Sequence, residues 1–190
     1  TRGITRTFAI QELTLPIALS GQDLIGQART GMGKTYGFGV PLLDRVFDDA
    51  DIEELDGTPR ALVVVPTREL AQQVTKDLQV AAADIPVRLV SIHGGRPYEE
   101  QITKLNKGAD VIIGTPGRLI DLHERGNLQL DRVAILVLDE ADEMLDLGFL
   151  PSVEAILQAL DGNAHQTMLF SATMPGAILP LARRFMDKPI

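Results

Sequence analysis

A glycine-rich stretch near the start of the chain carries a lysine and a threonine where they could bind phosphate. Residues 28–35 read Ala-Arg-Thr-Gly-Met-Gly-Lys-Thr, which fits the pattern of a phosphate-binding loop. Its glycines allow backbone conformations that a Cβ would block, so that successive N–H groups can surround an anion. Lys34 could then reach the β- and γ-phosphates of a nucleotide, and Thr35 could ligate a magnesium ion between them. The nucleotide-binding residues expected from the pattern are Ala28, Thr30, Gly31, Met32, Gly33, Lys34 and Thr35.

Two acids follow the most hydrophobic stretch of the chain, at 133–138, which is predicted to be a buried strand. Asp139 at its end, with Thr35 and phosphate oxygens, is a suitable ligand set for magnesium, which prefers oxygen and keeps several waters. Glu140 is then placed to orient or deprotonate an attacking water. The alternative is a pair of acids that open a loop and cap the next helix. With a phosphate loop in the same chain, the catalytic interpretation is the better one.

A third acid, Asp142, has possible partners near the end of the chain. Ser171 and Thr173 follow the predicted strand at 167–170, and their hydroxyls could bond Asp142 across adjacent strand ends. Such bonds would tie the metal site to another segment. The alternative is a serine or threonine that caps a helix, which would be preferred if this segment stood alone.

Strand-like and helix-like segments alternate along the chain. The predicted strands cover residues 23–26, 60–65, 87–92, 110–113, 133–138 and 167–170. The predicted helices cover residues 34–47, 69–82, 97–107, a segment after 118, 152–160 and 177–186, with a looser helical pattern over 3–19. Such alternation indicates βαβ units, and therefore an α/β fold with a doubly wound, mostly parallel sheet and helices on both faces.

The residues that could do chemistry each follow a predicted strand. In doubly wound sheets, ligands bind beyond the carboxyl ends of the strands. We therefore expect one edge of the sheet to carry the phosphate loop and the segments 66–68, 94–95, 115–118, 139–142 and 171–173. The apolar residues just after this acidic segment are expected in the core rather than in a binding stripe; they are Met144, Leu145, Leu147 and Phe149.

The composition fits a single folded domain over residues 1–190. Hydrophobic residues make up 45% of the chain, which excludes a disordered chain. The chain has no cysteine, which excludes disulfides and agrees with a reducing, cytoplasmic location. The longest apolar run, at 133–138, is too short to span a bilayer, so no membrane association is expected. Because the chain begins at Thr1 inside a motif described below, we expect it to be part of a longer protein.

The formal net charge of −8 is unexpected for a nucleic-acid-binding domain, which usually has a basic face. Residues 48–56 hold six acids and no base, and without them the net charge is −2. We expect this run to be a solvated loop between a helix and a strand.

Six short motifs occur in order along nearly the whole chain. They are ARTGMGKT, PTRELA, GG, TPGR, DEAD and SAT. Together with Gly3-Ile4 and Ile10-Gln11 they resemble the N-terminal RecA-like domain of the DEAD-box RNA helicase family. The resemblance implies a RecA-like P-loop NTPase domain that uses ATP and Mg²⁺ for non-processive unwinding of short RNA duplexes. It also implies a second RecA-like domain of the same protein, absent from this chain, that completes the active site.

The resemblance also implies roles for single residues at the nucleotide. Gln11 would recognise the adenine base. Lys34 and Thr35 would hold the phosphates and the magnesium ion, and Asp139 would hold the metal. Glu140 would activate the attacking water.

Other residues are implied on the RNA side. Asp142, with Ser171 and Thr173, would couple hydrolysis to RNA. The implied contacts to the RNA backbone are Pro66, Thr67, Arg68, Gly95, Thr115, Gly117 and Arg118. Backbone amides, hydroxyls and an occasional arginine can hold phosphates without reading bases, so the whole domain need not be basic.

Alternative interpretations use the same residues. The glycine-rich stretch alone could be a chance turn. The chain could bind nucleotide or RNA without catalysis, or it could belong to a DNA motor or a small-molecule kinase. A kinase would not explain PTRELA, TPGR and SAT, and a DNA motor usually has a different acidic motif. Stimulation of ATP hydrolysis by RNA and by DNA separates these alternatives.

Overall fold

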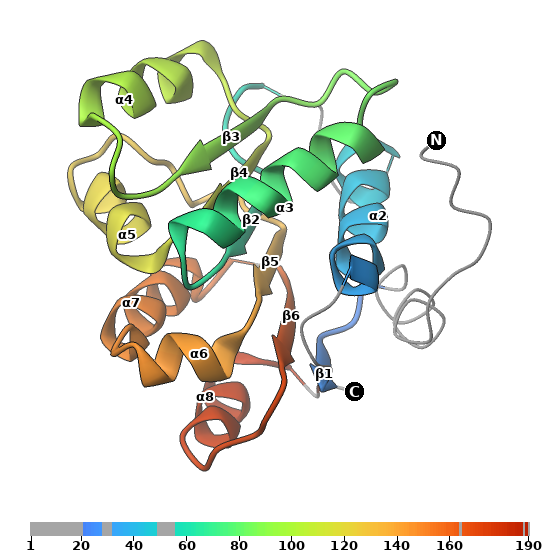
Figure 1. Cartoon of the computed structure of the whole chain (residues 1–190), viewed down its shortest axis with the longest axis vertical. Helices are drawn as coiled ribbons and strands as arrows, with labels where there is room; N and C mark the ends of the chain where they lie inside the picture. Colours follow the sequence, from blue (N-terminus) through green and yellow to red (C-terminus); the bar gives the residue numbers. More distant parts are fainter. Residues whose placement is uncertain (1–20, 28–31, 49–55, 164, 188, 190) are drawn as a thin grey trace.

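A six-stranded parallel sheet forms the centre of the chain (Figure 1). The computed structural model describes residues 21–27, 32–48, 56–163, 165–187 and 189. The strands are β1 (Leu24–Gln27), β2 (Ala61–Val64), β3 (Leu89–Ile92), β4 (Val111–Gly114), β5 (Ile135–Leu138) and β6 (Gln166–Ser171). Their order is β1-β6-β5-β2-β4-β3, and every neighbouring pair is parallel. The predicted parallel sheet is confirmed.

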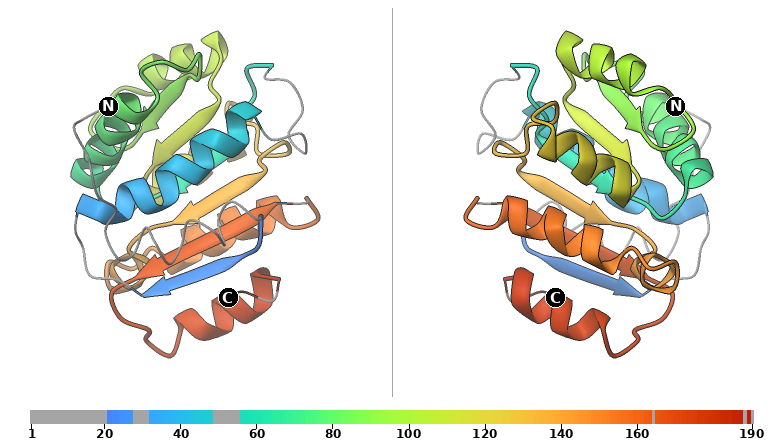
Figure 2. Two further views of the ribbon diagram at one scale, coloured as in Figure 1. Left: turned by 90° about the vertical axis from the view of Figure 1, so that its right-hand side faces the viewer. Right: turned by 90° about the vertical axis from the view of Figure 1, so that its left-hand side faces the viewer.

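Helices cover both faces of this sheet. They are α2 (Met32–Asp48), α3 (Arg68–Ala81), α4 (Tyr98–Lys107), α5 (Pro116–Glu124), α6 (Ala141–Asp146), α7 (Leu150–Leu160) and α8 (Ile178–Phe185). The chain runs outward from β1 through β2 to β3 and returns through β4 and β5 to β6. Because parallel crossovers are right-handed, the outward and return helices lie on opposite faces. α2 packs beside α3 on one face, and α5 beside α7 on the other (Figure 2).

Each face of the sheet has its own hydrophobic core. Leu62 and Val64 of β2 belong to the core beneath α5 and α7, whereas Ala61 and Val63 belong to the core beneath α2 and α3. This alternation follows from the two-residue period of a strand. Since both faces are buried, the strands read as continuous apolar runs in the sequence.

A glycine at the end of β4 lets the elements around the carboxyl edge approach closely. A Cβ at Gly114 would collide with the carbonyl oxygen of Ile92 in β3 and with the side chain of Leu119 in α5. Glycine therefore allows α5 to start directly over the end of the sheet, with Thr115 as its N-cap residue.

The structure differs from the sequence prediction just after β5. The acidic segment opens a separate short helix, α6, which was not predicted because its acids and short apolar pattern resemble a loop. Met144 is buried as predicted, but Leu147 is 51% exposed, so its assignment to the core was wrong. The reason is that Leu147 is the C-cap residue after α6, just before the turn at Gly148, whose φ is 82°. The helical pattern over 3–19 and most of the acidic run at 48–56 lie outside the described residues.

Candidate active site and nucleic-acid interface

Three of the predicted functional segments meet where β1, β6 and β5 end. β6 lies between the other two strands, and Ser171 at its end is in register with Gln27 at the end of β1. The Gln27 side-chain amide donates to the carbonyl of Ala172 at 3.3 Å. On the other side of β6, β5 ends one residue before Asp139. The strand order thus places the segments after β1, β5 and β6 next to one another.

The phosphate loop is described only where it enters α2. The helix begins at Met32, and for Met32, Gly33 and Lys34 only the helical backbone is described. The Thr35 side chain is buried in the first turn of α2. A helix start offers N–H groups without intrahelical partners, which suits an anion. The predictions for Gln11, Ala28, Thr30 and Gly31 lie outside the described residues.

The acids after β5 occupy a fixed turn. The Asp139 N–H donates to the carbonyl of Val64 at 2.9 Å, which extends the pairing of β5 with β2 by one bond. Glu140 then adopts a left-handed conformation with φ 55° and ψ 52°, the one positive φ among the described residues other than glycine. This conformation costs about 1–2 kcal/mol for a residue with a Cβ. Both side chains are buried, so the sharp turn holds two carboxylates at the end of the central strands.

Asp142 is bonded to the segment after β6, as the sequence predicted. Its carboxylate accepts from the Thr173 hydroxyl at 2.9 Å and from the Thr173 N–H at 3.1 Å. Its own N–H donates to the Ser171 hydroxyl oxygen at 3.1 Å, and that hydroxyl donates to the Thr173 carbonyl at 2.6 Å. These bonds join the first turn of α6 to the end of β6. We call these three residues the Asp142 network.

The Asp142 network keeps its carboxylate ionised. Partial burial raises the pKa of Asp142, but hydrogen bonds donated by the Thr173 hydroxyl and N–H and by the Glu143 N–H outweigh it, and the pKa lies below its ordinary value. The bonds therefore stabilise the folded state above the ordinary carboxyl pKa. This contribution is lost as pH falls through the lowered pKa of the folded state.

Thr173→Val is expected to raise the pKa of Asp142, because it removes a donor to the carboxylate and keeps the side-chain shape. An NMR titration of the Asp142 carboxyl carbon measures this shift. Thr103→Val is the matched control, since the Thr103 hydroxyl is exposed and donates within α4 to the Glu99 carbonyl. An Asp142 pKa that is the same in both variants would contradict the assigned hydrogen bond.

The segment after β2 combines a helix cap with an exposed cation. The Thr67 hydroxyl oxygen accepts from the Leu70 N–H at 3.1 Å and so caps α3, while its own proton stays available to a ligand. Arg68 is exposed, lies 3.4 Å from the Glu69 carboxylate and packs against Gly95 of the loop after β3. Pro66 is buried beneath this turn. The predicted RNA contacts after β2 and β3 therefore lie together.

The segment after β4 exposes a glycine beside the same loops. Thr115 donates its N–H to the Ile92 carbonyl at 3.1 Å and is half-buried, whereas Gly117 is exposed in the first turn of α5. A helix start with an exposed glycine presents backbone N–H groups, which can bind phosphate. An RNA contact by either residue stays a prediction.

Arg118 belongs to a network that the sequence did not predict. Its guanidinium carbon lies 3.9 Å from the centroid of the Tyr98 ring, a cation–π arrangement. Its Nη1 donates to the Arg96 carbonyl at 2.9 Å and to Gln101 Oε1 at 3.2 Å. Arg118 thus fastens the loop after β3 to α5, and a phosphate contact by this side chain stays a prediction. Sequence reasoning missed Tyr98 and Gln101 because a helix surface offers many polar side chains, and only the fold shows which ones face Arg118.

The oxygen groups at this edge fit magnesium. A buried carboxylate, Asp139, and a buried hydroxyl, Thr35, are hard oxygen donors. In the part of the chain that the structure describes, no three His, Asp or Glu side chains gather into a metal-binding group. Magnesium takes one or two carboxylates and completes its shell with water and substrate phosphates, so this small donor set is sufficient.

A doubly wound parallel sheet, a glycine-rich stretch before its first described helix and two acids after a central strand define a RecA-like domain. The model of the DEAD/DEAH box helicase family matches residues 8–179. The chain therefore belongs to this family.

Among the described residues, none of the helices is both long and apolar enough to cross a membrane.

Relatives agree with this assignment over the whole chain. The chain is 49% identical to DEAD-box ATP-dependent RNA helicase 3B, chloroplastic, of Zea mays, covering 100% of this chain and 25% of that protein. It is 48% identical to DEAD-box ATP-dependent RNA helicase CshA of Geobacillus kaustophilus, covering 98% of this chain and 38% of that protein. The chain thus spans about a quarter to two fifths of these curated relatives.

Solved structures show the same fold. A DEAD box protein from the hyperthermophile Methanococcus jannaschii matches with a TM-score of 0.91 and 38% identity, covering 100% of this chain and 50% of that chain. The yeast DEAD-box splicing factor Prp28 matches with a TM-score of 0.90 and 37% identity, covering 98% of this chain and 45% of that chain.

Proposed function

We propose that this chain is the ATP-binding half of an RNA-dependent ATPase that unwinds short RNA duplexes or remodels RNA–protein complexes. The observation that carries the proposal is the Asp142 network, which links the turn at Glu140 to the segment after β6. Through this link, a movement of the segment after β6 would reach the turn that carries the proposed base. The two curated relatives are both named as ATP-dependent RNA helicases, which supports the same function.

Hydrolysis would take place between the start of α2 and the turn after β5. Lys34 and the N–H groups at the start of α2 would bind the phosphates of ATP. Asp139 and Thr35 would hold Mg²⁺, which when bound neutralises charge on the phosphates. Glu140, fixed by its left-handed backbone, would take a proton from the attacking water. Gln11 would recognise the adenine base.

RNA would lie across the segments after β2, β3 and β4. Arg68 and the Thr67 hydroxyl are available there, and exposed Gly95 and Gly117 leave backbone N–H groups open. Such groups contact phosphates and sugars, so binding would depend little on base sequence.

Coupling would run through the Asp142 network. Asp142 lies two residues after Glu140, in the first turn of α6. A shift of Thr173 would therefore move the start of α6 and change where the Glu140 carboxylate points. A complete active site would also need a second RecA-like domain of the same protein. We call the protein with both domains the two-domain protein. The cytoplasmic location expected from the sequence stays a prediction.

Unwinding of a short duplex tests the function. In the two-domain protein, ATP is expected to support separation of an RNA duplex better than GTP, and a DNA duplex of the same sequence is expected to stay paired. The Gln11 amide matches the donor and acceptor on adenine but not the two acceptors on guanine, a difference of about 1–3 kcal/mol. Gln11→Ala should reduce the preference for ATP. Equal unwinding of RNA and DNA would contradict the proposal.

A further inference from the structure

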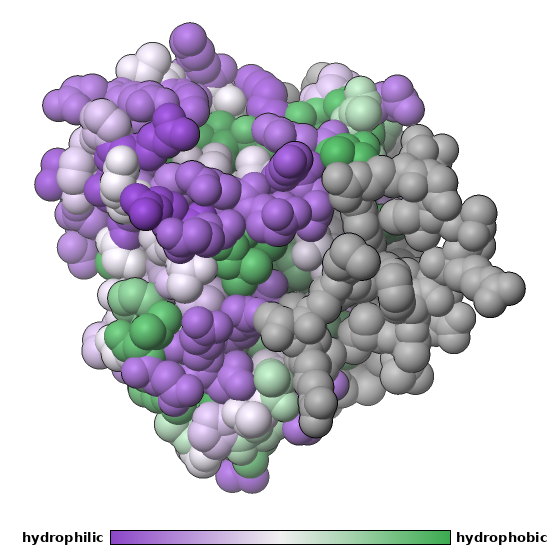
Figure 3. Space-filling model, viewed as in Figure 1, coloured by the Kyte–Doolittle hydropathy of each residue, from purple (hydrophilic) through white to green (hydrophobic). Residues whose placement is uncertain are grey.

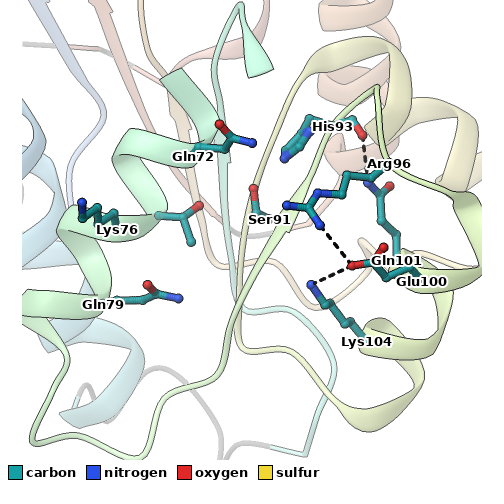
Figure 4. A pocket seen from close by; sticks show the side chains of 10 residues that line it. Gln72, Lys76, Gln79, Ser91, His93, Arg96, Glu100, Gln101 and Lys104 are labelled. Atoms are coloured by element: carbon teal, nitrogen blue, oxygen red, sulfur yellow. Dashed lines mark hydrogen bonds and ion pairs between the residues drawn. The ribbon is translucent and has the colours of Figure 1, made fainter. Parts of the chain in front are cut away.

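A polar cavity of about 380 Å³ lies between α3 and α4, beside β3 (Figure 4). β3 is the outermost strand of the sheet. One wall comes from α3, with Gln72, Lys76 and Gln79, and the other comes from α4 and the loop before it. Ser91 and His93 of β3 and its following loop lie between the two walls (Figure 4). The surface over α3 and α4 is predominantly hydrophilic (Figure 3).

The cavity is positively charged although the chain is acidic. Its lining includes three cations, Lys76, Arg96 and Lys104, and one acid, Glu100. Glu100 lies 3.4 Å from Arg96 and 3.7 Å from Lys104, so a single carboxylate is shared by two cations. A net positive lining in a chain with a net charge of −8 points to an anionic ligand.

Hydrogen bonds within the chain hold Gln101, one of the residues that line the cavity, in place. The Gln101 side chain is buried and donates to the His93 carbonyl at 2.8 Å, while its oxygen accepts from Arg118. The Ser91 hydroxyl oxygen is buried and has no hydrogen-bond partner within the described residues. A hydroxyl in this position can donate to a phosphate or sugar oxygen.

The cavity continues the predicted RNA interface. Three exposed residues of α3 are spaced four apart and therefore lie on one face of the helix: Arg68, Gln72 and Lys76. Eight residues of helix span about 12 Å, so this face leads from the Arg68 contact into the cavity. The loop after β3 belongs to both regions, since Arg118 holds the Arg96 carbonyl.

We propose that this cavity binds the phosphodiester backbone of the same RNA strand, where it continues past Gly95 along α3. The inference rests on the proposed function. Among the described residues that line the cavity there is no Phe, Tyr or Trp, so it holds phosphates and sugars without stacking a base. An acidic protein fits less well, because tryptophan and tyrosine often carry much of the binding energy in protein interfaces, and the described lining contains neither.

A length series of single-stranded RNA tests the proposal in the two-domain protein. The variant Lys76→Ala/Lys104→Ala is compared with Lys107→Ala/Arg183→Ala, which removes two exposed cations outside the cavity. Fluorescence anisotropy gives the affinity for each RNA length at several salt concentrations. The shortest RNA that binds is expected to bind equally to both variants, which also shows that both are folded.

For long RNA the cavity variant is expected to bind more weakly and with less salt dependence. Each lost single-strand phosphate contact lowers the slope of log affinity against log salt by about 0.7, so two lysines lower it by about 1.4. Lys76→Arg/Lys104→Arg should restore the original slope. If the two alanine variants had equal affinities and equal salt slopes at every RNA length, the cavity proposal alone would be overturned. The cations of the cavity would then bind a different anionic partner. If the two-domain protein bound RNA of no length, the proposed function would be overturned as well.

Discussion

Glu140→Gln in the two-domain protein is expected to abolish ATP hydrolysis and to preserve ATP binding. Glutamine keeps the length and hydrogen-bonding shape of the side chain but cannot accept a proton from water. A positioned general base contributes about 10²–10⁴ to a rate, so turnover should fall by at least the lower figure. Because hydrolysis then no longer releases the RNA, the variant should accumulate as a stable complex with ATP and RNA.

The matched control for this experiment is Glu143→Gln. Glu143 lies three residues later in α6 and is exposed, so it loses the same charge outside the buried turn. Phosphate release measures turnover, and retention of labelled RNA on a filter measures the trapped complex. Normal turnover by Glu140→Gln would show that another group activates the water.

Residues 1–190 by themselves are expected to hydrolyse almost no ATP, with or without RNA. An arginine that stabilises the transferred phosphoryl group is worth about 10³–10⁵ in turnover. Two described arginines near the carboxyl edge lie on the proposed RNA side: Arg68 packs against Gly95, and Arg118 holds the Arg96 carbonyl. Arg183 and Arg184 are exposed on α8. The arginine that stabilises the phosphoryl group would therefore come from the second RecA-like domain.

Mixing the two halves tests this expectation. Adding the second RecA-like domain as a separate chain at high concentration should restore part of the RNA-stimulated turnover. A folded state of residues 1–190 is checked first by cooperative thermal unfolding. RNA-stimulated turnover by residues 1–190 alone, abolished by Glu140→Gln, would show that this chain completes its own site.

Much of the fold and of the edge that carries the site was predictable from local patterns. A parallel strand buried on both faces must be apolar throughout, so Ala61–Val64 and Ile135–Leu138 stand out in the sequence. Polar residues directly after such strands must meet at one edge, which is why the bond between Asp142 and Thr173 could be anticipated.

The remaining features depend on contacts between elements far apart in the chain. The left-handed backbone of Glu140 follows from the path between β5 and α6, and its residue type does not predict it. The stacking of Arg118 on Tyr98 arises from the contact of α4 with α5, and the cavity arises from how α3 and α4 flank β3. Leu147 was misplaced for a similar reason, since only the structure shows that α6 ends just before it.

The most direct test of the account is the ATP turnover of the two-domain protein as RNA is added. A link through the Asp142 network predicts that turnover rises with RNA to a plateau and that DNA of the same sequence has little effect. Asp142→Ala should remove the rise with RNA, while the rate without RNA persists. Turnover that is the same with and without RNA would contradict the claim that this chain couples ATP hydrolysis to RNA.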